Sequence, residues 1–135
     1  MDTLVARLQD TLSSDQATRD AAEQYLAHET LPKSGTDDVL GVQLAQILSE
    51  ASLSLYVRQA AAIALKKYVR KRWSIFFDTF TQDMVVNGIV QTVDATPVEA
   101  KEHIRTSLLA CLCDAEPKVR SQASDILSLI SSCDF

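Results

Sequence analysis

Glycine, proline and cysteine are scarce in this chain of 135 residues, which holds three of each. Isolated glycines cannot form the glycine-rich loops that cradle phosphate groups, and the sequence contains no HExxH or Gly-x-Ser-x-Gly motif. So few turn-forming residues also argue against a sheet built on tight β-turns. These absences predict a protein that is not an enzyme and that needs no cofactor.

Long apolar runs are absent as well. The longest run near the centre is AAAIAL, at 60–65, whereas a membrane-spanning helix needs about 20 apolar residues. The N-terminal MDTLVARLQDTL has an acid at its second position and lacks the basic-then-apolar layout of a signal peptide. We therefore expect no membrane contact, and we expect the protein in the cytosol or the nucleus.

The three cysteines, Cys111, Cys113 and Cys133, form neither a metal-binding nor a disulfide pattern. Cys111 and Cys113 are two residues apart, so on a helix they point to different sides. No histidine lies at ligand spacing from them. An odd number of cysteines in a chain without a secretion signal argues against a disulfide scaffold. The cysteines are therefore expected to be buried free thiols, and no metal site is expected.

Charge is unevenly distributed along the chain. The net charge is −5, but residues 51–77 carry six basic side chains and no acidic one. The rest of the chain holds 7 basic and 18 acidic residues, a net charge of −11. An acidic body repels nucleic-acid backbones and attracts basic partners. Direct nucleic-acid binding is therefore not expected, and one local basic patch remains to be explained.

The spacing of apolar residues predicts helices along nearly the whole chain. The first helix is marked by Leu4, Val5, Leu8 and Leu12. Start signals for later helices are Ser14 or Asp15, Thr36 or Asp37, Thr96 followed by Pro97, and Pro117. The helix after Thr96 has the apolar stripe Ala100, Ile104, Leu108, Cys111 and Leu112. Successive amphipathic helices with short breaks favour an all-α fold.

Three of these helices share an internal repeat, visible when TRDAAEQYL, VRQAAAIAL and VRSQASDIL are aligned on Arg19, Arg58 and Arg120. Each arginine is followed by Ala three residues later and by Leu seven residues later. Residues at i+3 and i+7 lie on one helix face, so each helix repeats the same buried stripe. The first two arginines are 39 residues apart, close to the period of about 40 of HEAT and armadillo repeats. We therefore predict an α-α superhelix, a HEAT-repeat solenoid of about three helix pairs.

The pairs are expected at 1–31, 36–73 and 96–132. The second and third arginines are 62 residues apart, and the excess falls in an irregular insert at 74–95. Within it, VVNGIV is typical of a hairpin, and a short helix broken at Gly88 is the alternative. The last pair ends at SSCDF with an apolar face that nothing closes, so we expect a piece of a longer solenoid.

The helix over 57–73 is expected to present one buried and one exposed face. The buried stripe consists of Val57, Ala61, Leu65 and Tyr68, and Trp73 is expected in the core. The opposite row consists of Gln59, Ala62, Lys66 and Arg70, with Lys67 and Lys71 beside it. Equivalent rows are Asp20, Glu23 and Ala27 in the first pair, and Ser121, Ser124, Ser128 and Ser132 in the third. These rows predict an inner wall that is acidic, then basic, then rich in hydroxyls. The three aligned arginines are expected to be structural and to pair with acids such as Asp15 or Glu50.

The aligned helices resemble a known family. VRQAAAIALKKYVRKRW is similar to the second-repeat signature of the importin-β (karyopherin) superfamily, with an Ala block, then Leu-Lys, then Trp. TRDAAEQYL resembles the first repeat of the N-terminal domain, and KVRSQASDILSLISSCDF resembles the third. Within the superfamily, SEASLSLYVRQAAAIALKKYVRKRWS is most similar to the importin nine branch. The resemblance covers nearly the whole chain and is weakest at 78–95, and Lys67 departs from the Asn of many members.

This resemblance implies a nuclear import receptor that shuttles between cytoplasm and nucleus. In the family, the N-terminal repeats bind the GTP form of the small GTPase Ran, which releases imported cargo. Lys66 matches the Lys of the family's Leu-Lys dipeptide, so the expected Ran contacts are Lys66 first, then Lys67 and Arg70. The branch and the acidic body suggest basic protein cargo such as histones. The resemblance also implies nucleoporin contacts through the longer receptor.

Two alternatives remain open at this point. The first is a HEAT-repeat scaffold or regulatory subunit with no part in transport, which would not bind Ran according to its nucleotide. The second is a HEAT-like enzyme acting on nucleic acid, which would need a basic inner wall and would show salt-sensitive DNA binding. Only the second of the three predicted pairs is basic, which disfavours the enzyme.

Overall fold

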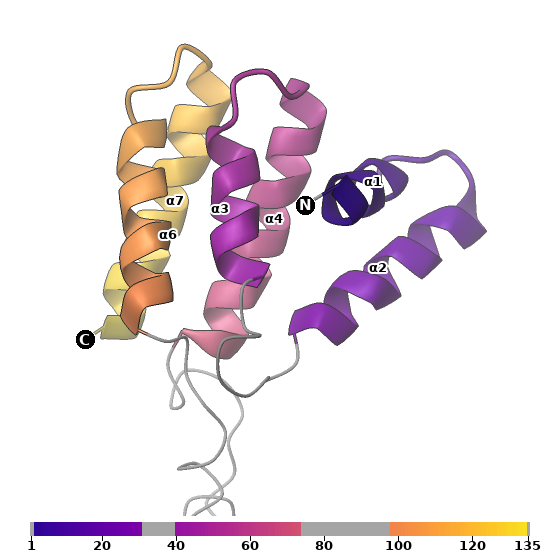
Figure 1. Ribbon diagram of the computed structural model, residues 1–135, viewed down its shortest axis with the longest axis horizontal. Coiled ribbons are helices and arrows are strands. Elements are labelled where there is room, and N and C mark those ends of the chain that lie inside the picture. Colours follow the sequence, from indigo (N-terminus) through magenta and orange to yellow (C-terminus); the bar gives the residue numbers. More distant parts are fainter. Residues whose placement is uncertain (1, 31–39, 74–97, 135) are drawn as a thin grey trace, which may run out of the picture.

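The protein is described by a computed structural model that places residues 2–30, 40–73 and 98–134. These residues form α1 (Asp2–Asp10), α2 (Gln16–Thr30), α3 (Leu40–Ser49), α4 (Leu55–Arg72), α6 (Val98–Cys111) and α7 (Pro117–Asp134). No strand occurs in this part of the chain. α3 with α4 and α6 with α7 stand as antiparallel pairs, whereas α1 is seen nearly end-on beside α2 (Figure 1). The all-α, HEAT-like superhelix predicted from the sequence is confirmed. The hairpin or short helix expected in the insert at 74–95 lies outside the described residues.

Polar side chains at the helix starts explain where the helices begin. Asp15 caps α2, because its carboxylate accepts a hydrogen bond from the backbone N–H of Thr18 at 3.0 Å. Bonds from the Thr18 hydroxyl and amide hold the pKa of Asp15 below its usual value. Ser54 caps α4 by accepting from the Val57 N–H at 3.3 Å. The predicted cap at Asp15 and the predicted start at Pro117 are therefore confirmed, and those at 36–37 and 96 lie outside the described residues.

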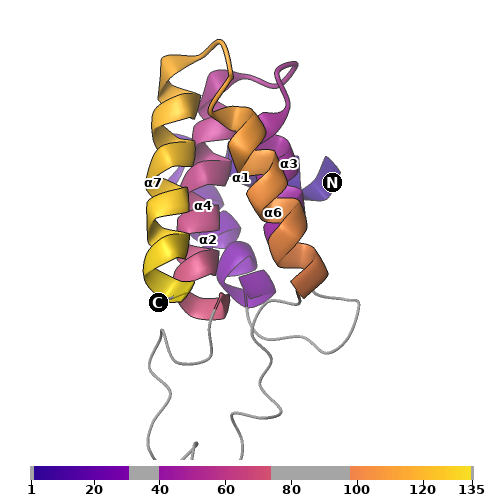
Figure 2. The same ribbon diagram turned by 90° about the vertical axis from the view of Figure 1, so that its left-hand side faces the viewer.

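The second and third pairs form one regular block. α3 packs on α6 and α4 packs on α7, so equivalent helices of the two pairs lie side by side (Figure 2). The predicted stripe of α4, namely Val57, Ala61, Leu65 and Tyr68, is buried, and so is Trp73. Ala60, Ala61 and Ala62 of α4 are also buried, and such small side chains allow neighbouring helices to approach closely.

The first pair is placed differently. Its two helices contact each other, and both also contact α4 (Figure 1). Leu4 and Leu8 of α1 and Ala22 of α2 are buried in these contacts. As a result α4 is the central element of the fold, with neighbours in all three pairs.

Two apolar residues assigned to helix stripes lie beyond the helix ends. Leu12 is 52% exposed because α1 ends at Asp10, where the Thr11 hydroxyl donates to the Leu8 carbonyl at 2.6 Å. Leu112 is 38% exposed because α6 ends at Cys111 and the chain turns toward α7. Both predictions were wrong because a helical period does not show where a helix stops.

Gly41 on α3 allows two core side chains to approach its backbone closely. A Cβ atom there would lie 2.5 Å from Cε1 of Tyr68 and 2.9 Å from Cδ1 of Ile104, and both side chains are fully buried. We expect Gly41→Ala to lower the free energy of unfolding by about 1–2 kcal/mol, because overpacking outweighs the better helix propensity of alanine. Urea unfolding measures this, with Gln46→Ala on the exposed side of α3 as the control. An unchanged midpoint for Gly41→Ala would show that the core has room for the methyl group.

Candidate interaction surface

The exposed side of α4 forms a continuous ridge. Tyr56, Gln59, Ile63, Lys67 and Arg70 recur at spacings of three and four residues, so they lie on one helix face. Tyr56 is 69% and Ile63 is 53% exposed, and Lys67 and Arg70 are also exposed. We call these five residues the α4 ridge. It is apolar toward the N-terminal end of the helix and basic toward the C-terminal end.

The exposed residues of the α4 ridge differ from the exposed row that the sequence predicted for this helix. Ala62 was expected on the exposed wall but is fully buried. Lys66 is partly covered, and its Nζ lies 3.7 Å from the Asp125 carboxylate of α7. The reason is that α7 packs along this flank of α4, which turns the exposed face away from Ala62 and toward Ile63 and Lys67.

The rows predicted on the neighbouring helices are exposed. On α2 these are Asp20, Glu23 and Ala27, and on α7 they are Ser121, Ser124, Ser128 and Ser132. The Ser132 hydroxyl donates to the carbonyl of Ser128 at 3.2 Å. The predicted exposure of these two rows is therefore confirmed, whereas their alignment into one inner wall stays a prediction.

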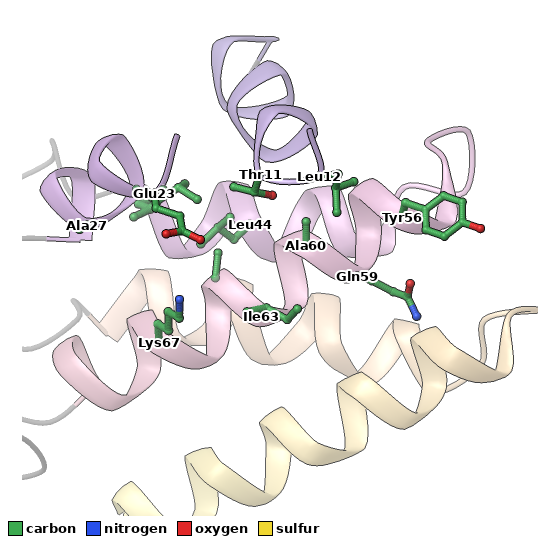
Figure 3. A pocket seen from close by; sticks show the side chains of 13 residues that line it. Thr11, Leu12, Glu23, Ala27, Leu44, Tyr56, Gln59, Ala60, Ile63 and Lys67 are labelled. Atoms are coloured by element: carbon green, nitrogen blue, oxygen red, sulfur yellow. The ribbon is translucent and has the colours of Figure 1, made fainter. Parts of the chain in front are cut away.

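A groove lies between part of the first pair and the α4 ridge. It is a pocket of about 370 Å³, lined by α2, α3, α4 and the turn after α1 (Figure 3). Leu26, Leu40 and Leu44 contribute to its apolar lining, and Ile63 contributes from the α4 ridge. Glu23 and Lys67 stand on opposite walls. Sequence reasoning missed this groove because its walls come from separate helix pairs.

A buried arginine ties the second pair to the third beneath this surface. Arg58 is 3% exposed; its Nε donates to the Leu48 carbonyl at 2.8 Å, and its two terminal nitrogens contact the Asp114 carboxylate. Arg120 donates to the backbone carbonyl of Asp114 at 2.8 Å. Hydrogen bonds from Arg58 and from the Glu116 N–H hold the pKa of Asp114 below its usual value.

The partner of Arg58 therefore differs from the prediction. Glu50 instead accepts hydrogen bonds from the amide and hydroxyl of Ser52, which lower its pKa. The Arg19 guanidinium donates to the Gln16 side chain at 2.9 Å, and its charge also helps to lower the pKa of Asp15. Asp114 lies 56 residues from Arg58, and no local pattern in the sequence links the two.

Trp73 closes the core at the C-terminal end of α4. It is fully buried, and two cations of α6 lie over its ring, with Lys101 Nζ and Arg105 Cζ each 5.2 Å from a ring centroid. Cations at this distance interact favourably with the indole face. The predicted core position of Trp73 is confirmed, whereas its two cationic neighbours were not expected.

The two cysteines whose side chains are described differ in environment. Cys111 is buried, and burial raises the pKa of its thiol to about 11. Cys113 is exposed, which contradicts the expected burial, because it lies in the turn after α6. Among the described residues, no group of three or more His, Cys, Asp or Glu side chains is arranged to hold a metal ion. No helix in the described ranges is long and apolar enough to span a membrane.

Comparison with known proteins places this arrangement in a family. Exportin-2 of Drosophila melanogaster is 26% identical over 132 residues, covering 98% of this chain and 12% of that protein. Importin-9 of the same organism is also 26% identical over 132 residues, with the same coverage, in agreement with the importin nine resemblance. Exportin-2 of Danio rerio is 27% identical over 135 residues. The chain thus spans about an eighth of the length of these curated relatives. Residues 27–114 match the importin-beta N-terminal domain, and the chain belongs to that family.

Proposed function

We propose that this chain is the Ran-GTP-binding N-terminal region of a nuclear import receptor that carries protein cargo through the nuclear pore. Membership of the importin-beta N-terminal domain family is the observation that carries this proposal. The described surface adds the exposed cations Lys67 and Arg70, which suit an acidic protein partner. On this proposal the chain acts as a binding module, not as an enzyme, in a receptor that shuttles between cytoplasm and nucleus.

We assign the Ran contact to Lys66, Lys67 and Arg70. Lys67 and Arg70 are exposed on the α4 ridge, so an acidic partner surface reaches them without moving the fold. Lys66 is already near Asp125, so it contributes by exchanging one carboxylate for another. The described helix pairs are assigned to repeats at 1–31, 36–73 and 96–132, separated by the insert at 74–95.

Charge reversal of the ridge tests the contact. We expect Lys67→Glu with Arg70→Glu to weaken binding of GTP-loaded Ran at least tenfold, because two attractions become repulsions. Isothermal titration with GTP-loaded and GDP-loaded Ran measures the effect, and Lys66→Glu is titrated separately. Lys118→Glu, an exposed reversal on α7, is the matched control and should change affinity little. Equal affinity for the two nucleotide forms would contradict the Ran assignment and favour a scaffold.

Cargo is the second part of the proposal. The acidic body favours basic cargo, with histones as the candidate class, and nucleoporins are expected to contact the longer receptor. An import receptor should lose its cargo when GTP-loaded Ran is added. Cargo that stays bound under those conditions would contradict import while leaving Ran binding intact.

A further inference from the structure

The first helix pair packs against the rest of the fold mainly through one helix, α4. The second and third pairs share a more extensive interface. The second and third pairs meet through both of their helices, α3 on α6 and α4 on α7. The first pair, in contrast, rests with both α1 and α2 on α4 (Figure 1). Such an attachment lets the pair rotate as a unit about one helix, which is how packed elements commonly move.

Each wall of the groove carries a large exposed apolar side chain, and a rotation of the first pair would bring the two walls together. Leu12, from the turn after α1, is 52% exposed and lines the groove opposite the α4 ridge. Ile63 on that ridge is 53% exposed and lines the same groove as Leu12 (Figure 3). Movement of the first pair toward α4 removes these side chains from water, which is favourable in proportion to the apolar area covered.

The two charged residues of the groove match each other. Glu23 extends from α2, Lys67 extends from α4, and Figure 3 shows them at the same end of the groove. Within the described ranges neither side chain has an ion-pair partner. An acid and a base facing each other across an apolar gap complement one another when the gap narrows.

We propose that the first helix pair closes onto the α4 ridge, so that Leu12 and Ile63 become buried and Glu23 pairs with Lys67. The groove is then filled by the approach of its own wall, the first helix pair, and not by a separate molecule. The open and closed arrangements form a two-state equilibrium. Closure also covers Lys67, and this regulatory consequence rests on the proposed Ran contact.

Distances between spin labels test the closure without any partner. Labels at Gln24→Cys on α2 and Ser128→Cys on α7 report movement of the first pair toward the block, since both sites are exposed. Labels at Gln46→Cys and Ser128→Cys lie within the block and serve as the reference. Cys113 and Cys133 are replaced by serine, and the buried Cys111 is kept. Double electron–electron resonance should give two distances between the labels at positions 24 and 128, and one distance between those at 46 and 128.

Charge variants then identify the contact. Glu23→Lys should reduce the short-distance population about threefold, in line with an exposed ion pair turned into a repulsion. The exchange Glu23→Lys with Lys67→Glu should restore that population. Asp20→Lys, an equal charge change one turn earlier on α2 and outside the groove lining, should leave it in place. A single long distance in every variant would overturn the proposal, as would an equal effect of Glu23→Lys and Asp20→Lys.

A binding measurement separates this inference from the proposed function. If Lys67 also contacts Ran, Glu23→Gln should raise the affinity for GTP-loaded Ran a few-fold by favouring the open arrangement. Two distances without any Ran binding would support closure and contradict the proposed function. Ran binding with one fixed distance would support the function and overturn closure.

Discussion

Asp114→Ala is expected to lower the free energy of unfolding by about 3 kcal/mol, because it leaves the Arg58 guanidinium buried without its carboxylate. The side chain of Arg58 is 4% exposed in this ion pair and that of Asp114 is 12% exposed. Removing one partner of a buried pair costs more than the pair contributes, since the remaining charge has lost its hydration. Urea unfolding followed by circular dichroism measures the loss.

Two further variants test whether the loss of stability comes from the buried charge of Arg58. Asp125→Ala removes an exposed acid from α7 and should cost less than about 1 kcal/mol. Adding Arg58→Met to Asp114→Ala removes the buried charge itself, so the double variant should be more stable than Asp114→Ala alone. A double variant that is less stable would mean that the Arg58 bond to the Leu48 carbonyl matters more than the ion pair.

The ion pair of Arg58 and Asp114 should also make the stability of the fold depend on pH. The pKa of Asp114 is lowered in the folded protein by its bonds from Arg58 and Glu116. A lowered folded pKa contributes stability that is present above the unfolded value of about 3.9 and is lost as the pH falls through the folded value. Wild-type protein should therefore lose stability below about pH 4, and Asp114→Ala should lose less over that interval. Parallel pH slopes for the two proteins would contradict this assignment.

Trp73→Ala should have the largest effect of any single change, about 3–5 kcal/mol. Trp73 is the largest of the fully buried side chains, and its removal leaves a cavity where α4 meets α6. It also removes the ring over which Lys101 and Arg105 lie. Because Trp73 is the only tryptophan, unfolding must be followed by circular dichroism, since the variant has no indole fluorescence.

A conservative replacement provides the control for Trp73. Trp73→Phe keeps an aromatic face for the two cations and fills part of the volume, so it should cost clearly less than Trp73→Ala. If both variants lost the same stability, the cations and the cavity would not explain the effect. If Lys67 and Arg70 contact Ran as proposed, Trp73→Ala should also weaken that binding indirectly, because it loosens the end of α4 that carries them.

Local patterns in the sequence predicted the features that depend on neighbours along the chain. The stripe Val57, Ala61, Leu65 and Tyr68 follows the helical period, and all four residues are buried. The Asp15 cap and the helix start at Pro117 depend on residues three or fewer positions away. Repetition of Arg, Ala and Leu in three helices led to the solenoid and to the importin-β resemblance, which the family match confirms.

Contacts between helix pairs were beyond the sequence. Ala62 and Ile63 are adjacent small and large apolar residues, and nothing in their spacing says which one α7 covers. The partner of Arg58 was sought nearby, at Glu50, whereas the fold brings Asp114 from the third pair. Exposure of Leu12 likewise follows from where α1 stops and how the first pair sits on α4.

The amino-acid sequence by itself determined the helices, their buried stripes, the basic character of α4 and the family, because these follow from periods and signals within a few turns of helix. Only the tertiary structure decided that Ala62 is buried and Ile63 is exposed, that Lys66 is partly engaged by Asp125, and that a groove opens beside the basic face. The physical reason is that an exposed face is what remains after neighbouring helices have packed. That packing depends on residues far apart in the chain.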